Sequence, residues 1–368
     1  MPILIQATQF GRLFREQIPL IDVRAPSEFA RGAFPTAENL PLLNDEERRA
    51  VGTCYRQQGR DAAIALGFSL VDESEQKKRL DAWIEFASLH PEAMLYCYRG
   101  GLRSTISQQW LDEAGANVPR IAGGYKALRR FLLDVIEAVA SNAEMLIVAG
   151  KTGSGKTRFI NTVENSLDLE ARANHRGSAF GRRALPQPSQ IDFENRIAID
   201  LIKLDWQNRK RLVLEDESRA IGSLSVPQNF HRRMNASPIA VIEETLANRV
   251  QTIHSDYIQS NYQDFQLHFP QQADELFAQS LTESLERIRK RLGGENYQHI
   301  QSLLRSALET QLQGEGIDEH KLWIEALLTR YYDPMYDYQL QKKSQRIVFR
   351  GNRDELRNWI QPVINPGC

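Results

Sequence analysis

Cysteine is scarce in this sequence: its 368 residues include only three, Cys54, Cys97 and Cys368. An odd number at wide spacing excludes a disulfide framework and a cysteine-based zinc site. No apolar run approaches the ~18 residues that a membrane-spanning helix needs, and the first residues lack the basic region of a signal peptide. These absences predict a soluble, cytoplasmic protein with no membrane partner.

The sequence also lacks an excess of charge of either sign, with 46 Lys and Arg against 47 Asp and Glu. This balance excludes a uniformly basic nucleic-acid binder but is compatible with a local basic face. Positive charge gathers between residues 151 and 211, which hold 12 Lys and Arg against 7 Asp and Glu. The basic runs are Arg182-Arg183, Arg209-Lys210-Arg211 and, further on, Arg232-Arg233. They would suit contacts with a phosphate backbone, or form a solvated charged surface.

At roughly 100–200 residues per domain, the length predicts two or three domains. Residues 1–138 alternate short apolar segments, such as 19–24 and 94–98, with helical stretches. This alternation predicts an α/β domain with a parallel sheet covered by helices on both faces.

A further apolar segment at 145–149 opens a second α/β domain, which we assign to residues 139–368. From about residue 236 the apolar spacing becomes helical, and Gly293-Gly294 ends one such helix. Residues 347–349 predict one last strand.

The strongest motif directly follows the strand at 145–149 and precedes a helical stretch starting at Arg158. It matches the pattern G-x-x-x-x-G-K-[ST] in full. Its residues are Gly150, Lys151, Thr152, Gly153, Ser154, Gly155, Lys156 and Thr157. Glycines let backbone N–H groups surround phosphate oxygens, the lysine neutralises an outer phosphate, and the last hydroxyl is placed to ligate Mg²⁺. The motif predicts a ligand with a diphosphate group and leaves ATP, GTP and other diphosphates open.

Acidic residues follow the next strand, predicted at 211–215. Glu215-Asp216-Glu217 fits the strand-plus-acid partner that completes many phosphate-loop sites, and we predict Asp216 as that partner. The same acids would also suit a solvated strand end. Mg²⁺ is compatible with these residues, and no metal ligands are assigned.

A second loop of chemical interest follows the strand at 94–98. A cysteine at the head of such a loop faces backbone N–H groups and a helix N-terminus, which favour the thiolate. Nearby arginines would complete a pocket for phosphate, sulfate or a selenium-bearing anion. We predict Cys97 and Arg103 as catalytic residues; a buried core cysteine is the alternative. The predicted anion-binding residues are Arg99, Gly100, Gly101 and Ser104.

Two chemistries fit the spacing Cys-x5-Arg. In a phosphatase, Cys97 attacks a phosphoester while Arg103 holds its oxygens; in a chalcogen transfer, Cys97 carries a persulfide or perselenide. Residues 20–35 and 39–41 resemble the entry segment of rhodanese domains, a fold that serves both chemistries. The loop is one residue longer than the common sulfurtransferase loop, which indicates a larger donor.

Two further groups of residues leave alternatives open. His175-Arg176-Gly177 would form either a substrate-binding loop or an exposed turn. Tyr331, Tyr332, Tyr336 and Tyr338 would either stack on bases or belong to the core.

As a whole, the chain resembles the tRNA 2-selenouridine synthase family, in which a rhodanese-like domain precedes a P-loop domain. Besides the two loops, five segments carry the resemblance: 51–59, 123–127, 174–181, 187–190 and 215–219. The resemblance implies an N-terminal rhodanese-like, doubly wound parallel sheet. It also implies a P-loop α/β domain with a helical C-terminal portion.

The resemblance implies a tRNA-modifying selenotransferase that converts wobble 2-thiouridine to 2-selenouridine through an S-geranyl-2-thiouridine intermediate. The phosphate loop would hold geranyl diphosphate, and the pocket at 97–104 would hold selenophosphate while Cys97 takes the selenium. The implied partners are tRNA and a supply of selenophosphate. From the residues alone, a rhodanese-fold phosphatase or sulfurtransferase with a nucleotide-binding P-loop regulatory domain remains the alternative.

Overall fold

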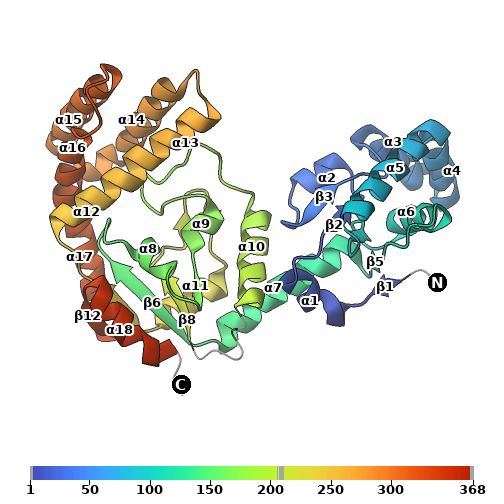
Figure 1. Ribbon diagram of the computed structural model, residues 1–368, viewed down its shortest axis with the longest axis horizontal. Helices are drawn as coiled ribbons and strands as arrows, with labels where there is room; N and C mark the ends of the chain where they lie inside the picture. Colours follow the sequence, from blue (N-terminus) through green and yellow to red (C-terminus); the bar gives the residue numbers. More distant parts are fainter. Residues whose placement is uncertain (1–2, 205, 207–210, 365–368) are drawn as a thin grey trace. The chain divides into compact units, whose positions relative to one another are not determined.

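The computed structural model describes residues 3–204, 206 and 211–364 (Figure 1). Cys368 and the basic pair Arg209-Lys210 lie outside the described residues. By contacts the chain forms two compact units, one of residues 1–136 and 189–203 and the other of residues 137–188 and 204–368. The predicted α/β class with two parallel sheets is confirmed.

The first unit contains a parallel five-stranded sheet in the order β1-β5-β4-β2-β3. Leu20 of β2 pairs with Met94 of β4, and Asp22 pairs with Tyr96, so the two strands end at the same edge. Their residues at this edge lead into the loop that carries Cys97. The strands are β1 (Leu4–Ile5), β2 (Leu20–Asp22), β3 (Ala37–Asn39), β4 (Met94–Tyr96) and β5 (Arg120–Ile121).

Helices cover both faces of this sheet because its strand residues are apolar on both sides. On one face, Ile21 and Leu95 share a core with Trp83 and Trp110. On the other, Tyr96 packs edge-on against Phe34. The helices are α1 (Phe10–Arg15), α2 (Pro26–Ala30), α3 (Asp45–Gln58), α4 (Arg60–Leu70), α5 (Glu73–Leu89), α6 (Leu102–Glu113) and α7 (Gly124–Asn142), with a short 3₁₀ turn, η1 (Ala7–Gln9).

Helix α10 (Gln190–Lys203) belongs to the first unit although the sequence on both sides of it belongs to the second. It contacts α1, and Asp192 accepts a hydrogen bond from the backbone N–H of Ala33 at 2.8 Å. Arg129 of α7 donates to Asn195 at 2.8 Å and pairs with Glu194. The predicted division at residue 138 gives two domains that are each continuous in sequence. The contacts instead add residues 189–203 to the first unit, which is therefore made of two separate segments.

The second unit contains a parallel five-stranded sheet in the order β12-β11-β6-β8-β7 and a separate hairpin. Residues 239–242, which the sequence analysis placed in a helical region, form strand β11 beside β6. Four consecutive buried apolar residues there are typical of a central parallel strand and carry no helical period. The strands are β6 (Met145–Gly150), β7 (Ser166–Leu167), β8 (Leu212–Glu215), β9 (Ala220–Ile221), β10 (Leu224–Ser225), β11 (Ile239–Ile242) and β12 (Ile347–Gly351).

The predicted helical C-terminal portion follows β11 (Figure 1). It has its own core of apolar side chains, including Phe277, Ile300 and Trp323. Two stretches of π-helix, η2 and η3, interrupt its helices. None of the described helices has the length and apolar character needed to cross a membrane. The helical segments of the whole second unit, apart from the end of α7, are α8 (Lys156–Ile160), α9 (Leu169–Ala173), α11 (Gln228–Ala236), α12 (Leu246–Ile253), η2 (His254–Gln259), α13 (Ser260–His268), α14 (Ala273–Leu292), α15 (Gly294–Leu312), α16 (His320–Leu327), η3 (Leu328–Tyr332), α17 (Asp333–Lys342), η4 (Ser344–Arg346) and α18 (Arg353–Ile364).

Candidate functional site

The cysteine loop joins β4 to α6 in the first unit. Cys97 directly follows β4 and is 3% exposed. Its Sγ atom lies 3.2 Å from the Oγ atom of Ser104, whose hydroxyl donates to the carbonyl oxygen of Gly101 at 3.0 Å. Ser104 is fully buried and therefore contacts the thiol from inside the protein.

The shape of this loop depends on a glycine at the start of α7, in the turn that follows β5. Gly124 has φ +58°, and a Cβ atom there would lie 2.1 Å from the carbonyl oxygen of Cys97 and 2.5 Å from the backbone nitrogen of Gly100. The same carbonyl accepts a hydrogen bond from the backbone N–H of Tyr125 at 2.9 Å. Close backbone approach thus requires glycine at position 124.

A pocket of about 640 Å³ opens at the loop. Four of the residues predicted for this site line it: Cys97, Arg99, Gly101 and Arg103. Three further arginines, which were not predicted from the sequence, also line it: Arg24, Arg31 and Arg48. The only acidic side chain among the described lining residues is that of Glu28. The excess of arginines makes this an anion-binding pocket.

Arg103 does not lie free in the pocket. Its guanidinium makes two hydrogen bonds to Glu28, of 2.5 and 3.2 Å, and the Nε atom of Arg48 lies 3.2 Å from the same carboxylate. Burial alone would raise the pKa of Glu28, but the bonds and charges of Arg103 and Arg48 outweigh it and lower that pKa to about 2. Glu28 is therefore ionised at neutral pH, and it holds the two arginines at the pocket wall.

Arg24 is 1% exposed and forms a buried ion pair with Asp22, at 2.6 Å. It also donates to the carbonyl oxygens of Glu28 and Gly32, and its guanidinium lies 3.8 Å from the ring centroid of Tyr125. These bonds fix the backbone around Glu28. The Asp-Val-Arg sequence at 22–24, directly after an apolar strand, is the sequence feature from which Arg24 could have been predicted as a residue of this site.

The phosphate loop connects β6 to α8 in the second unit. Gly153 and Gly155 have φ of +84° and +80°, conformations that glycine adopts readily. Lys156 donates to the carbonyl oxygen of Gly150 at 2.8 Å, and Lys151 pairs with Asp337 at 2.8 Å. Of the eight predicted residues, those that line the pocket at this loop are Gly150, Thr152, Gly153, Gly155, Lys156 and Thr157.

Three glutamates cluster beside the phosphate loop, and one ligand atom of each lies within 4.8 Å of the others: Glu170, Glu215 and Glu217. The Thr157 hydroxyl donates to Glu215 at 3.1 Å and lies 3.4 Å from Glu170. Burial, and then the charge of Glu170, raises the pKa of Glu215 and of Glu217 well above the usual value. The Oε1 atom of Glu215 is buried without a hydrogen-bond partner. Crowded hard oxygen donors with an unused lone pair fit Mg²⁺.

Asp216, the acid chosen from the sequence, does not contact Thr157. Its carboxylate accepts hydrogen bonds from Lys343 at 2.7 and 2.8 Å. Glu215 takes the predicted place because side chains alternate along a strand, so that neighbouring residues point to opposite faces. Sequence alone identified the acidic segment but not which of its members faces the loop.

The pocket at the phosphate loop has a volume of about 1600 Å³ and is rich in arginine. The described lining includes Arg176, Arg182, Arg183, Arg287 and Arg291. His175 also lines it and is 5% exposed, so it is not an exposed turn residue. Burial, and then the charges of four of these arginines (Arg182, Arg287, Arg183 and Arg176), lowers the pKa of His175 to about 4. Of the two basic runs that the structure describes in full, the run at 182–183 lines this pocket and the run at 232–233 does not.

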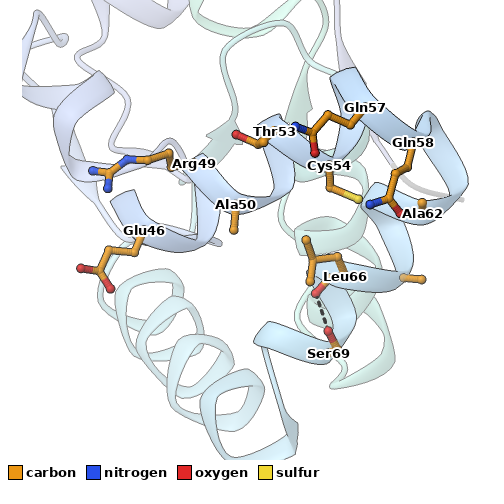
Figure 2. Close-up of a pocket in the computed structure, with 11 residues that line it drawn as sticks. Glu46, Arg49, Ala50, Thr53, Cys54, Gln57, Gln58, Ala62, Leu66 and Ser69 are labelled. Atoms are coloured by element: carbon orange, nitrogen blue, oxygen red, sulfur yellow. Dashed lines mark hydrogen bonds between the residues drawn. The ribbon is translucent and has the colours of Figure 1, made fainter.

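A third pocket, of about 830 Å³, lies between α3 and α4 in the first unit (Figure 2). Cys54 is 8% exposed and contributes to its wall, together with Thr53 and Gln57 (Figure 2). The cysteine has no arginine-lined loop around it comparable to that of Cys97. Cys54 therefore serves as a matched control for cysteine chemistry.

The tyrosines of the last helices divide between core and surface. Tyr331 and Tyr332 are buried in the core of the helical portion, whereas Tyr338 is 61% exposed. Lys342 lies 4.1 Å above the Tyr338 ring centroid.

Comparisons with known proteins match both halves of the chain. Residues 143–365 match the family model described as "tRNA 2-selenouridine synthase AAA domain", and residues 7–130 match "Rhodanese-like domain". The first match alone covers more than half of the chain.

Relatives named "tRNA 2-selenouridine synthase" align along nearly the whole chain. The protein from Pseudomonas putida (strain GB-1) is 48% identical over 96% of this chain and 96% of its own length. That from Shewanella oneidensis is 49% identical over 97% of this chain and 95% of its own length. A solved structure, the N-terminal domain of a putative ATP/GTP binding protein from Clostridium difficile 630, is 34% identical over 35% of this chain and 98% of its own length, with a TM-score of 0.33.

Proposed function

The chain belongs to the tRNA 2-selenouridine synthase family, and on that premise we propose that it converts wobble 2-thiouridine in tRNA to 2-selenouridine, using geranyl diphosphate and selenophosphate. The observation that carries the proposal is the presence, in one chain, of an arginine-lined cysteine pocket and a complete phosphate loop. The first suits an anionic selenium donor, and the second suits a diphosphate.

The phosphate loop supports the first step, S-geranylation of the tRNA. The sulfur on C2 of the uracil ring attacks C1 of the geranyl group, so that a C–S bond forms, the C1–O bond breaks, diphosphate leaves and the N3 proton is lost to solvent. Lys156 and the backbone N–H groups at the start of α8 would stabilise the charge on that leaving group. Mg²⁺, when held by Thr157 and the three glutamates, would supply further positive charge.

The cysteine pocket supports the second step, in which selenium replaces geranylthiolate at C2. Selenophosphate carries selenium at the oxidation level of selenide, so transfer onto Cys97 as a perselenide would require an oxidant. Attack of the Cys97 thiolate on phosphorus requires none: an S–P bond forms, the P–Se bond breaks and hydroselenide leaves. Hydroselenide then adds to C2 and geranylthiolate departs, while water hydrolyses the phosphocysteine.

Nucleoside mass analysis of tRNA from a strain lacking the gene, complemented with each variant, tests this function. The wild type and Cys54→Ser should form 2-selenouridine. Cys97→Ser should accumulate S-geranyl-2-thiouridine, because serine is far less acidic than cysteine and the phosphate loop is intact. Lys156→Ala should leave most of the 2-thiouridine unmodified.

Formation of normal 2-selenouridine by Cys97→Ser would overturn the assigned nucleophile. Tight ATP binding with turnover by the purified wild type, and no geranyl transfer to thiolated tRNA, would instead support a nucleotide-binding regulatory domain. Competition between geranyl diphosphate and ATP on the same protein distinguishes the two ligands, since both require Lys156.

A further inference from the structure

Arg176 is a buried arginine that lines the phosphate-loop pocket and has no ion-pair partner in the part of the chain that the structure describes. It lies between α9 and α10 and is 9% exposed. Its guanidinium donates a long hydrogen bond to the Oδ1 atom of Asn261, at 3.5 Å, and lies 5.3 Å from the ring centroid of Tyr257. No carboxylate among the described residues lies within 4.0 Å of it.

This arrangement costs folding free energy, because a buried guanidinium loses its hydration and gains no direct ion pair in return; Asp256 and Asp264 act on it only from a distance. Burial, and then the nearby charge of Arg183, lowers the pKa of Arg176. The Nε atom of Arg183 is also buried and has no hydrogen-bond partner. Two neighbouring guanidinium groups with unused donors are the arrangement expected where an anion binds.

The loop that carries Arg176 adjoins the phosphate loop. A Cβ atom on the next residue, Gly177, would lie 2.2 Å from the Oε1 atom of Glu170. The Oε2 atom of Glu170 lies 3.4 Å from the Thr157 hydroxyl. A single carboxylate thus separates the Arg176 loop from the end of the phosphate loop, so one ligand or two adjacent ligands would reach both.

We propose that Arg176 and Arg183 form a second phosphate-binding site in this pocket, in addition to the phosphate loop. Its ligand is a phosphate group, supplied either by the prenyl diphosphate or by the tRNA backbone. The choice of these two sources rests on the proposed function, whereas the site itself rests on the two arginines. Arg182, Arg287 and Arg291 line the same pocket and extend its positive charge.

Equilibrium binding of pyrophosphate and of unmodified tRNA to the full chain tests the site without turnover. Arg176→Met and Arg183→Met should each lower the affinity for one of these two ligands by about 10- to 100-fold, the usual loss for a charge-assisted hydrogen bond. Arg176→Lys, which keeps the charge, should retain part of the affinity. Arg305→Met removes an exposed arginine of α15 that does not line the pocket and should bind as the wild type does.

The two ligands distinguish the source of the phosphate. Weaker pyrophosphate binding with unchanged tRNA binding assigns the site to the prenyl diphosphate. Weaker tRNA binding assigns it to the tRNA backbone, provided that the slope of log affinity against log salt concentration also falls by the amount expected for about one phosphate contact. Unchanged affinity for both ligands in Arg176→Met and Arg183→Met would overturn the proposal.

Thermal unfolding without ligand separates binding from a structural role. Arg176→Met should have a Tm equal to or above that of the wild type, because it removes an unpaired buried charge. A lower Tm with unchanged affinities would identify Arg176 as a structural residue. Because these measurements need no selenouridine formation, failure of the proposed reaction would leave the pyrophosphate result unaffected.

Discussion

The charge of Glu28 decides how the arginines of the cysteine pocket are arranged. Its carboxylate binds Arg103 through two hydrogen bonds and contacts Arg48 at 3.2 Å. The arginine predicted to bind the donor is therefore already oriented, and a donor phosphate would compete with Glu28 for its N–H groups. Residue types were predictable from the sequence here, but their pairing was not.

Arg103→Ala should raise the KM for selenophosphate by about 10- to 100-fold, because one charge-assisted contact is lost and Glu28 then repels the donor. Geranyl transfer, which we assign to the second unit, should be unaffected. Steady-state kinetics with selenophosphate and S-geranylated tRNA would measure the effect, with the exposed Arg60→Ala as control. An unchanged KM would exclude Arg103 from donor binding.

The low pKa of Glu28 also predicts a pH dependence of stability. Because its folded-state pKa of about 2 lies below the usual 4.5, its ion pairs stabilise the folded state above pH 4.5. That contribution is lost as the pH falls from 4.5 to 2. In Glu28→Gln the Tm should fall less steeply across this window than in the wild type, as followed by circular dichroism. Parallel curves would contradict the assignment.

In the second unit, three crowded carboxylates should respond to a divalent cation. Glu215→Gln should raise the Tm in the absence of Mg²⁺, because it relieves repulsion in a buried cluster. Added Mg²⁺ should stabilise the wild type and should have a much smaller effect on the variant. Thermal unfolding with EDTA and with Mg²⁺ gives both values. Asp216→Asn, whose carboxylate pairs with Lys343, is the control and should keep the Mg²⁺ response.

At the scale of elements, both candidate loops join a parallel strand to a helix, and glycine backbones determine their shape. The cysteine loop follows β4 and the phosphate loop follows β6. In each, backbone N–H groups at the start of a helix are left without partners in the helix and are available to anions.

Gly124→Ala should displace the cysteine loop, since the new Cβ atom would lie 2.1 Å from the carbonyl oxygen of Cys97. Selenium exchange should be lost while geranyl transfer remains, as measured by nucleoside analysis. Gly115→Ala provides the control: its φ of +83° is also left-handed, but no atom lies within 4 Å of the added Cβ. That variant should lose only about 1 kcal/mol of stability and remain active. Equal effects of the two substitutions would refute the steric argument.

At the scale of the whole molecule, the two units are not two consecutive halves of the chain. Helix α10, at residues 190–203, packs in the first unit although its sequence follows the phosphate loop. Hydrogen bonds from Arg129 to Asn195 and from Ala33 to Asp192 hold it there.

Expression of fragments 1–138 and 139–368 tests this arrangement. Fragment 1–138 should have a lower Tm than the first unit in the full chain, because it lacks α10. Fragment 139–368 should aggregate, because the buried apolar residues of α10, such as Phe193 and Ile197, would lose their covering. Adding residues 189–203 to the first fragment through a flexible linker should restore its stability. Equal stability with and without these residues would show that α10 is dispensable.

The sequence by itself determined the fold class and the position of both loops. A full phosphate-loop motif after an apolar strand leaves few alternative structures, since its glycines and lysine must occupy fixed places. Rhodanese-like segments likewise indicated the first unit. Strand β11 was missed because a short apolar run has no period that separates a buried strand from a helix.

Only the tertiary structure decided which side chains meet. It paired Glu28 with Arg103, turned Glu215 rather than Asp216 toward Thr157, and buried Arg176 with no ion-pair partner among the described residues. It also placed α10 in the first unit. Each of these depends on contacts between residues distant in the chain or on the alternation of side chains along a strand. Local sequence patterns limit which residue types occur in a segment, whereas packing of the whole chain determines the partner and the burial of each one.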